Sequence, residues 1–226
     1  MSKKIENEET LAELENANES LEAKVKKNLK ALSIIGIVIA LIVVGVIVYI
    51  FLVRQPAIKK QDNAIAQADR EMLMTGNDSL ANQKYQKVAE GGYAAGNRAK
   101  LMSAIGLYKD GKYNEAIAML KGYDVKDDIV GPAALSLLGD CYVNTDKLND
   151  AIDTFKKAVK ESDENPYYTP IFLVKLAHIY HEQKNYTEEA KMYQEIVDKY
   201  PQFLQTSGIN VEKELERANT LAGNAK

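Results

Sequence analysis

The chain has 226 residues, of which 46% are hydrophobic and 27% charged, the balance of a folded protein rather than a disordered one. Its net charge of −3 argues against nucleic-acid binding through bulk charge. The single cysteine, Cys141, excludes a disulfide bond within the chain. The fold therefore has to be predicted from the pattern of hydrophobic residues along the chain.

Residues 1–31 form a charged tail with a helical pattern. Apolar residues and asparagines recur in it at alternating spacings of three and four, at Leu11, Leu14, Asn18, Leu21, Val25, Asn28 and Leu32. This heptad pattern predicts a short coiled coil and, with it, a weak parallel homodimer. The alternative is a solvated amphipathic helix that lies near a membrane surface, where the lysines at the end of the tail suit anionic headgroups.

Residues 32–53 are hydrophobic on every side and carry no charge. A helix of this length is about 33 Å long, which matches a hydrocarbon core of about 30 Å. No small-residue cleavage site follows the segment, so we expect an uncleaved transmembrane helix rather than a signal peptide. A buried core helix is the alternative, although such a helix in a small domain would need a polar stripe.

The charges that flank residues 32–53 bear on the orientation of this helix. Basic residues before it are Lys24, Lys26, Lys27 and Lys30, and those after it are Arg54, Lys59 and Lys60. The small excess on the N-terminal side favours a cytoplasmic N-terminus. A signal anchor also exports a long following domain more readily than a short preceding tail, so we expect the remainder of the chain outside the cytoplasm.

Past Pro56 the sequence repeats itself with a period of 35 residues. The repeated residues are small at Ala81, Ala116 and Ala151, bulky at Tyr85, Leu120 and Phe155, and of turn type at Gly76, Gly111 and Asp146. A fourth unit follows at a spacing of 38, with Tyr180, Lys184 and Tyr193 in the places of Tyr142, Asp146 and Phe155, and the insertion is expected between Ser162 and Pro170. Because a small residue lets two helices approach and a bulky one fills the adjacent space, this period predicts helical hairpins that stack.

We therefore predict an all-α fold, in which the transmembrane helix is followed by an α-solenoid of helical hairpins. The predicted helices are 8–54, 57–75, 79–90, 94–110, 113–123, 132–145, 148–162, 168–183, 187–200 and 208–223. The repeat domain covers 57–223 in this prediction, with about four repeats and a closing helix. Thr187 is the expected cap of its helix, and Gly91-Gly92 and Gly131-Pro132 are expected to break helices.

The third unit resembles the tetratricopeptide repeat (TPR). The run Leu135-x-x-Leu138-Gly139-x-x-Tyr142, followed by Ala151-x-x-x-Phe155, matches the TPR pattern, with Leu135 where a tryptophan is usual. In the fourth unit Glu189 takes the place of the small residue, and Ala190 comes one position later. This departure leaves the packing of the fourth hairpin open.

The layout as a whole resembles the ancillary SecYEG translocon subunit family, the YfgM-like TPR proteins of bacterial inner membranes. The stretches from Gly91 to Ala99 and from Ile179 to Pro201 are similar to segments of that family. The resemblance implies a cytoplasmic N-terminus, one helix in the inner membrane, and a periplasmic TPR domain that contacts the Sec translocon and periplasmic chaperones. The alternative is a TPR adaptor for another cell-envelope assembly, in division or outer-membrane biogenesis.

The first helix of each hairpin lines the concave face of a TPR stack, which is the usual surface for partner proteins. The residues expected there are Arg70, Met74, Leu101, Ile105, Tyr108, Asp140, Val143, Asn144, Val174, His178 and His181. Leu101, Ile105 and Asp140 stand where a carboxylate clamp has lysines and asparagines, so a C-terminal Glu-Glu-Val-Asp tail is not the expected ligand. The alternative is that apolar members of this set only pack against neighbouring helices.

No residue pattern indicates catalysis, a cofactor or a resident metal ion. His178, His181 and Glu182 lie close together on one predicted helix, but they lack a fourth ligand and form a weak metal motif. Cys141 occupies a small-residue position inside a predicted helix and is expected to be a packed thiol. An enzyme would need a catalytic domain, for which the repeats leave no residues. The sequence therefore predicts a protein-binding scaffold without enzyme activity.

Overall fold

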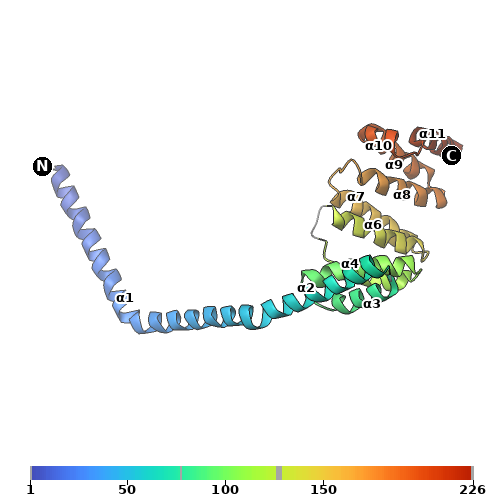
Figure 1. Cartoon of the computed structure of the whole chain (residues 1–226). Coiled ribbons are helices and arrows are strands. Elements are labelled where there is room, and N and C mark those ends of the chain that lie inside the picture. Colours follow the sequence, from blue (N-terminus) through green and yellow to red (C-terminus); the bar gives the residue numbers. More distant parts are fainter. Residues whose placement is uncertain (1, 77, 126–128, 225–226) are drawn as a thin grey trace. The chain divides into compact units, whose positions relative to one another are not determined.

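The computed structural model describes residues 2–76, 78–125 and 129–224, and the side chains of 18–29, 31, 33–76, 78–125 and 129–223. Every regular element in these ranges is a helix, so the predicted all-α fold is confirmed (Figure 1). The chain divides into two compact units, Met1–Ala57 and Ile58–Lys226.

The N-terminal unit consists of helix. It contains α1 (Ser2–Tyr49), the π-helical turn η1 (Ile50–Arg54) and the beginning of α2 (Gln55–Arg70). A hydrophobic window within the helical segment Ser33–Thr75 has a mean hydropathy of 3.3 and buries none of its residues against the rest of the protein. The segment is thus long and apolar enough to cross a membrane.

Pro56 does not interrupt the helix, contrary to the predicted break between 54 and 57. The N–H of Gln55 donates to the carbonyl oxygen of Ile50, five residues earlier, in the wider turn of a π-helix. A proline inside a regular α-helix lacks an N–H and clashes with the preceding turn, and a local π-turn relieves such a clash. This explains why α2 continues through Pro56.

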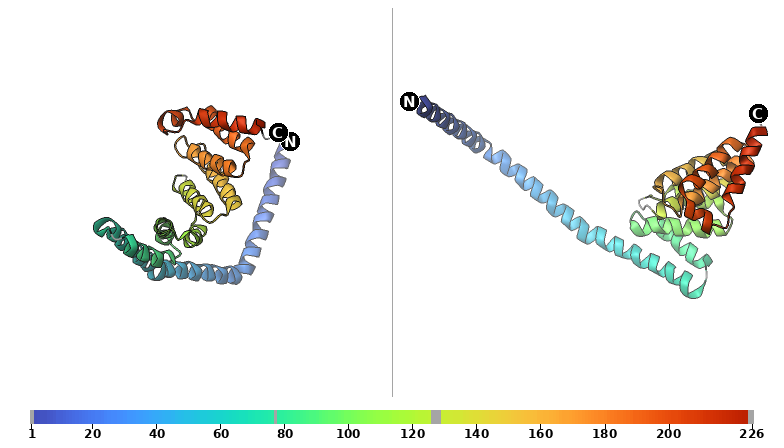
Figure 2. Two further views of the ribbon diagram at one scale, coloured as in Figure 1. Left: turned by 90° about the vertical axis from the view of Figure 1, so that its right-hand side faces the viewer. Right: turned by 90° about the horizontal axis from the view of Figure 1, so that it is seen from above.

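The C-terminal unit is a row of short helices. These are the remainder of α2 from Ile58 on, η2 (Glu71–Thr75), α3 (Asp78–Ala89), α4 (Ala94–Lys109), α5 (Tyr113–Lys121), α6 (Val130–Val143), α7 (Leu148–Glu161), α8 (Thr169–Glu182), α9 (Tyr186–Lys199), α10 (Pro201–Thr206) and α11 (Val211–Asn224). From α3 to α9 each helix packs against the next, and α11 packs against α9. The successive hairpins α4–α5, α6–α7 and α8–α9 follow one another as an α-solenoid (Figure 2).

The repeated residues have the packing roles that their period predicts. The small residues Ala81, Ala116 and Ala151 are buried, and so are the bulky residues Tyr85, Leu120 and Phe155. A methyl group added to Gly139 would lie 2.6 Å from the Phe155 ring, which shows how closely α6 and α7 approach. The alternation of small and bulky residues therefore sets the spacing of the hairpins.

The turn residues also keep the period. Left-handed backbone, with φ between 56° and 72°, occurs at Gly76, Gly111, Asp146 and Lys184. After three of these turns a backbone N–H reaches back five residues to close the preceding helix, from Lys112 to Leu107, from Lys147 to Tyr142 and from Asn185 to Tyr180. The same C-terminal cap thus ends the first helix of each of these three hairpins.

The structure corrects three local predictions. Asn185, not Thr187, caps α9, because Thr187 lies inside its first turn while the Asn185 side chain accepts a hydrogen bond from the N–H of Glu188. Helix α6 begins at Val130, two residues before the predicted start at Pro132, so Gly131 lies in its first turn; Pro132 is tolerated there because it removes only an N–H without a helical partner. For the same reason Pro201 opens an unpredicted helix, α10, and the closing helix begins only at Val211.

Candidate partner-binding surface

The predicted surface residues lie on η2 and on the first helices of the hairpins, or next to these elements. Those that are exposed are Arg70, Met74, Asn144 and His178, and those that are half-buried are Leu101, Ile105, Tyr108, Asp140, Val143 and His181. Val174, in contrast, is buried in a C-terminal core cluster with Leu173 and Ala177, so it contributes to packing and not to a surface. Half-buried apolar residues on successive helices are suited to contact with another chain.

Three of these residues also support the central core. Leu101, Tyr108 and Val143 pack against the buried cluster that joins the middle hairpins. The Tyr108 ring meets Tyr113 edge to face, with 5.4 Å between the ring centroids, and burial raises the pKa of its hydroxyl. These side chains are therefore held in place while part of each remains accessible.

Asp140 on α6 forms an ion pair with Lys175 on α8, which ties the first helices of two hairpins together. The Lys175 ammonium group also lies 5.4 Å from the centroid of the Phe155 ring. Burial raises the pKa of Asp140, and the opposing effect of Lys175 does not cancel this rise. Asp140 thus serves the packing of the solenoid as well as lining the candidate surface.

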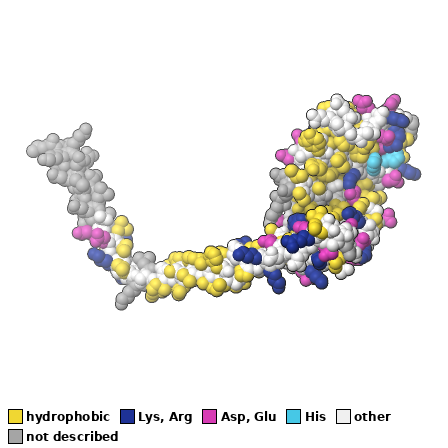
Figure 3. All heavy atoms as spheres, viewed as in Figure 1, with side chains coloured by type: hydrophobic (Ala, Val, Ile, Leu, Met, Phe, Trp, Pro, Cys, Tyr) yellow, Lys and Arg dark blue, Asp and Glu magenta, His cyan; other side chains and the backbone are white. Residues whose placement is uncertain are grey.

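Two hollows share residues with the candidate surface. One, of about 680 Å³, is lined by residues that include Tyr93, Asn97 and Leu101. The other, of about 330 Å³, is lined by residues that include His178, His181 and Ile209. Figure 3 shows hydrophobic side chains gathered over α6, α7 and α8, with charged side chains around them.

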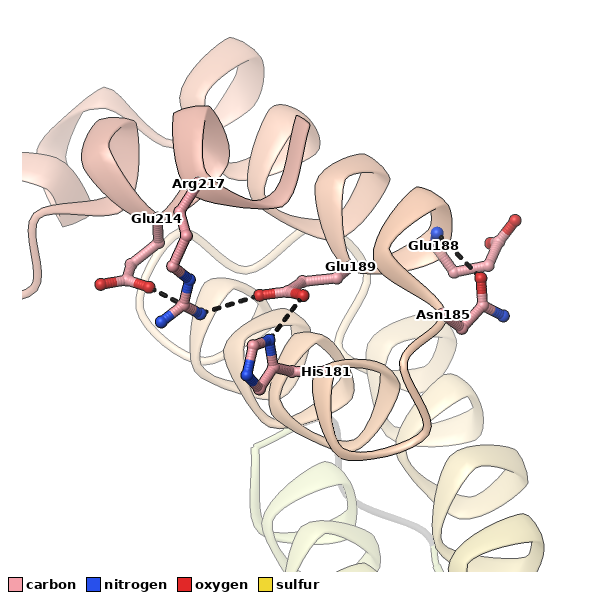
Figure 4. A network of polar contacts seen from close by, with 6 residues as sticks. All are labelled: His181, Asn185, Glu188, Glu189, Glu214 and Arg217. Carbon is pink, nitrogen blue, oxygen red and sulfur yellow. Dashed lines mark hydrogen bonds and ion pairs between the residues drawn. The ribbon is translucent and has the colours of Figure 1, made fainter. Parts of the chain in front are cut away.

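His181 belongs to a polar network with a fully buried carboxylate at its centre (Figure 4). Glu189 on α9 is 0% exposed and lies 2.9 Å from the Nδ1 atom of His181 and 2.9 Å from the Nη2 atom of Arg217 on α11. Arg217 also pairs with Glu214 at 2.8 Å. Burial, together with the negative charges of Glu189 and Glu214, raises the pKa of Tyr193 to about 12.

The network answers the question that the sequence left open about the fourth hairpin. Glu189 is buried where the pattern has an alanine, because polar partners from α8 and α11 reach its carboxylate. Reasoning from the sequence missed Arg217, since an arginine on an amphipathic closing helix looks like any solvated charge. The unusual glutamate in a small-residue position was the signal that a cationic partner had to be near.

His178 and His181 share a hollow, but the structure gives them no metal site. Among the described side chains, no group of three or more His, Cys, Asp and Glu residues is arranged to hold a metal ion. His181 is engaged through Nδ1 with Glu189, while His178 is exposed.

Comparison with known proteins agrees with this architecture. Tetratricopeptide repeat models match residues 132–165 and 172–202. A crystal structure of MamA superposes with a TM-score of 0.57 at 21% identity, covering 72% of this chain and 82% of MamA. The TPR-like repeats of a Podosopora anserina kinesin light chain give 0.56 at 14% identity, with 73% and 87% covered. No curated protein sequence matches significantly.

The C-terminal unit thus has the α-solenoid fold of stacked helical hairpins. Two of its hairpins, α6–α7 and α8–α9, coincide with the segments that match tetratricopeptide repeat models, and the solved structures share the fold. At identities below 25% these structures support the fold alone. TPR repeats imply a scaffold for protein–protein interaction.

Proposed function

We propose that this protein is a single-pass, membrane-anchored TPR scaffold without enzyme activity that binds other proteins through the face formed by α4, α6 and α8. The observation that carries the proposal is the row of half-buried apolar residues Leu101, Ile105 and Tyr108 on α4 and Val143 on α6, next to which α8 contributes the exposed His178 and the half-buried His181. An unburied hydrophobic helical segment in the same chain supplies the means of attachment.

We further propose that the anchor lies in a bacterial inner membrane, with the N-terminus in the cytoplasm and the TPR domain in the periplasm. The proposed partners are the SecYEG translocon and periplasmic chaperones. Support comes from the resemblance to the YfgM-like family and from the lysines that precede the hydrophobic segment. A role in division or outer-membrane biogenesis is the competing proposal, because other envelope assemblies also use anchored TPR proteins.

Affinity purification from crosslinked membranes tests the partner and the surface together. The wild-type protein is expected to recover the Sec channel, and Ile105→Asp combined with Tyr108→Ala is expected to reduce recovery about tenfold or more, as for loss of an interface hot spot. Lys157→Asp with Tyr167→Ala likewise introduces an aspartate and removes a tyrosine ring, at exposed positions on α7 and in the loop before α8, and serves as the control. Circular dichroism must show equal helix content in all three proteins.

Each result bears on one part of the proposal. Unchanged recovery of the channel by the Ile105/Tyr108 variant would refute the α4–α8 surface. Recovery of a division or outer-membrane assembly in place of the Sec channel would favour the competing proposal. A C-terminal alkaline phosphatase fusion, active only outside the cytoplasm, tests orientation, and release of the protein from membranes by alkaline carbonate would refute the anchor.

A further inference from the structure

The closing helix α11 packs through a narrow stripe of small and medium-sized apolar residues. Among its described side chains only Val211 and Ala218 are buried, while Leu215, Leu221 and Ala222 are half-buried. Beneath α11 lie the large residues Tyr193 and Ile196 of α9, in the same core cluster. Without this helix, α9 would present these hydrophobic side chains to water.

At the junction of α11 and α9 lies the buried carboxylate of Glu189. Its two oxygens have different partners: Oε1 accepts from Arg217 on α11, and Oε2 lies against His181 on α8. The Glu189 side chain is 0% exposed, whereas the Arg217 side chain is 46% exposed. The two charges would therefore respond differently to loss of the partner, because a buried carboxylate cannot recover its hydration and a half-exposed arginine can.

We propose that Glu189 and Arg217 form a charged latch that makes α11 a detachable cap on the last hairpin. With the latch closed, α11 covers Tyr193 and Ile196. With the latch broken, α11 leaves as a unit while the hairpins before it stay folded, and the apolar end of the solenoid is uncovered. An alanine at this position, as in the other three units, would pack without requiring any particular residue on the closing helix.

Removal of the two halves of the latch is expected to loosen α11 to very different extents. Arg217→Gln leaves Glu189 buried with His181 alone, so α11 should open much more often. Glu189→Ala restores the residue type of the repeat and leaves Arg217 free to face water beside Glu214, so α11 should loosen only slightly. Once Glu189 is alanine, a further change of Arg217 to Gln should have no added effect.

Hydrogen–deuterium exchange of the full-length protein in detergent, followed by mass spectrometry, measures this opening directly. In Arg217→Gln, amides of Val211–Asn224 are expected to exchange about tenfold faster or more, with α4 unchanged. Glu189→Ala and the double variant are both expected to accelerate the same amides by less than about threefold. Lys213→Gln, which removes an exposed charge from the same helix, is the matched control and should behave as wild type.

Two outcomes would overturn the latch. In the first, the amides of α11 exchange no faster in Arg217→Gln than in Lys213→Gln. In the second, amide exchange in Arg217→Gln rises equally in α4, α8 and α11, which would mean that Glu189 and Arg217 stabilise the whole domain. If Arg217→Gln does not accumulate as folded protein, Glu189→Ala and the double variant still test the latch. Equal exchange in Glu189→Ala and the double variant supports the latch, and faster exchange in the double variant contradicts it.

Discussion

Arg98 donates two hydrogen bonds to the carboxylate of Asp69, from Nη1 to Oδ2 at 2.9 Å and from Nη2 to Oδ1 at 3.0 Å. The hydroxyl of Tyr85 donates a third, at 2.6 Å, to Oδ1. One carboxylate on α2 thus joins α3 and α4, at the place where the pair of helices α2 and α3 meets the first helix of the next hairpin. Burial acts to raise the pKa of Asp69, but the hydrogen bonds from Arg98 and Tyr85 and the charge of Arg98 outweigh it and lower the pKa.

Because the pKa of Asp69 is lower in the folded protein, its ionised form stabilises the fold. This contribution is present above the unfolded pKa, near 4, and is lost as the pH falls through the folded value. We expect Asp69→Asn to lower the free energy of unfolding by about 1 kcal/mol at neutral pH, a modest figure since Arg98 is half exposed. The variant should also lose less stability than wild type below about pH 4.

Denaturant unfolding of the full-length protein across this pH range measures both effects. Asp78→Asn is the control. Asp78 is exposed, and this change removes only a surface ion pair with Lys109, in which Nζ and Oδ2 are 3.6 Å apart. If Asp69→Asn were as sensitive to acid as the wild-type protein, the assigned role of the three hydrogen bonds would be wrong.

Gly139→Ala is expected to destabilise the third hairpin by overpacking. The added methyl group would lie 2.6 Å from two ring atoms of Phe155, and such clashes in a core cost about 1–3 kcal/mol. Phe155→Leu, which introduces the residue found at the corresponding Leu120, should relieve the clash. The double variant should therefore be more stable than the sum of the two single changes predicts.

Thermal unfolding of the four proteins gives this coupling energy. Gly122→Ala is the matched control, since its methyl group would meet nothing nearer than 3.5 Å. Strict additivity of Gly139→Ala and Phe155→Leu would show that the close approach of α6 and α7 does not limit the size of residue 139.

Cys141 is expected to be inert toward thiol reagents in the folded protein. It is buried, and burial together with the charge of Asp140 raises its pKa to about 11, so only about one molecule in a thousand carries the reactive thiolate at pH 8. Labelling with an aromatic disulfide at pH 8 should proceed at the rate of opening of the fold and become fast in denaturant. Immediate stoichiometric labelling of the native protein would contradict this, with Cys141→Ser as the blank.

Asn185→Ala is expected to lower the free energy of unfolding by about 1 kcal/mol, because it removes the side-chain cap of α9. Thr187→Ala, two residues further on, should change the free energy by less than about 0.5 kcal/mol, since Thr187 is an exposed residue of the first turn. Chemical denaturation separates the two variants. Equal losses from both changes would mean that the cap is not confined to Asn185.

Many features of the fold could be predicted because they depend on neighbours in sequence. Ala116 and Leu120 are four residues apart and so share a helix face, and their recurrence as Ala151 and Phe155 indicates the same packing in the next hairpin. Local patterns were less reliable where a residue has two common uses. Pro201 was expected only to follow a helix. It follows α9 and also begins α10, since proline suits both the position after a helix and the first turn of one.

The candidate surface was predicted only in part, since a repeat template indicates which positions face inward but not which are covered. Val174 occupies an inward position and is nevertheless buried, because the surrounding cluster of α8 and α9 encloses it. Leu101 at the matching position stays half-buried. The difference depends on neighbouring helices whose contacts the template does not specify.

The sequence by itself determined the hydrophobic segment, the helical hairpins and their period, because these depend on side chains within a few residues of one another. Only the tertiary structure decided which charges meet. Asp69 finds Arg98 across 29 residues, and Glu189 finds Arg217 across 28. Each pair is chosen by the packing of helices that are distant in the chain, and a charged residue on an amphipathic helix looks the same in sequence whether it faces water or a buried partner.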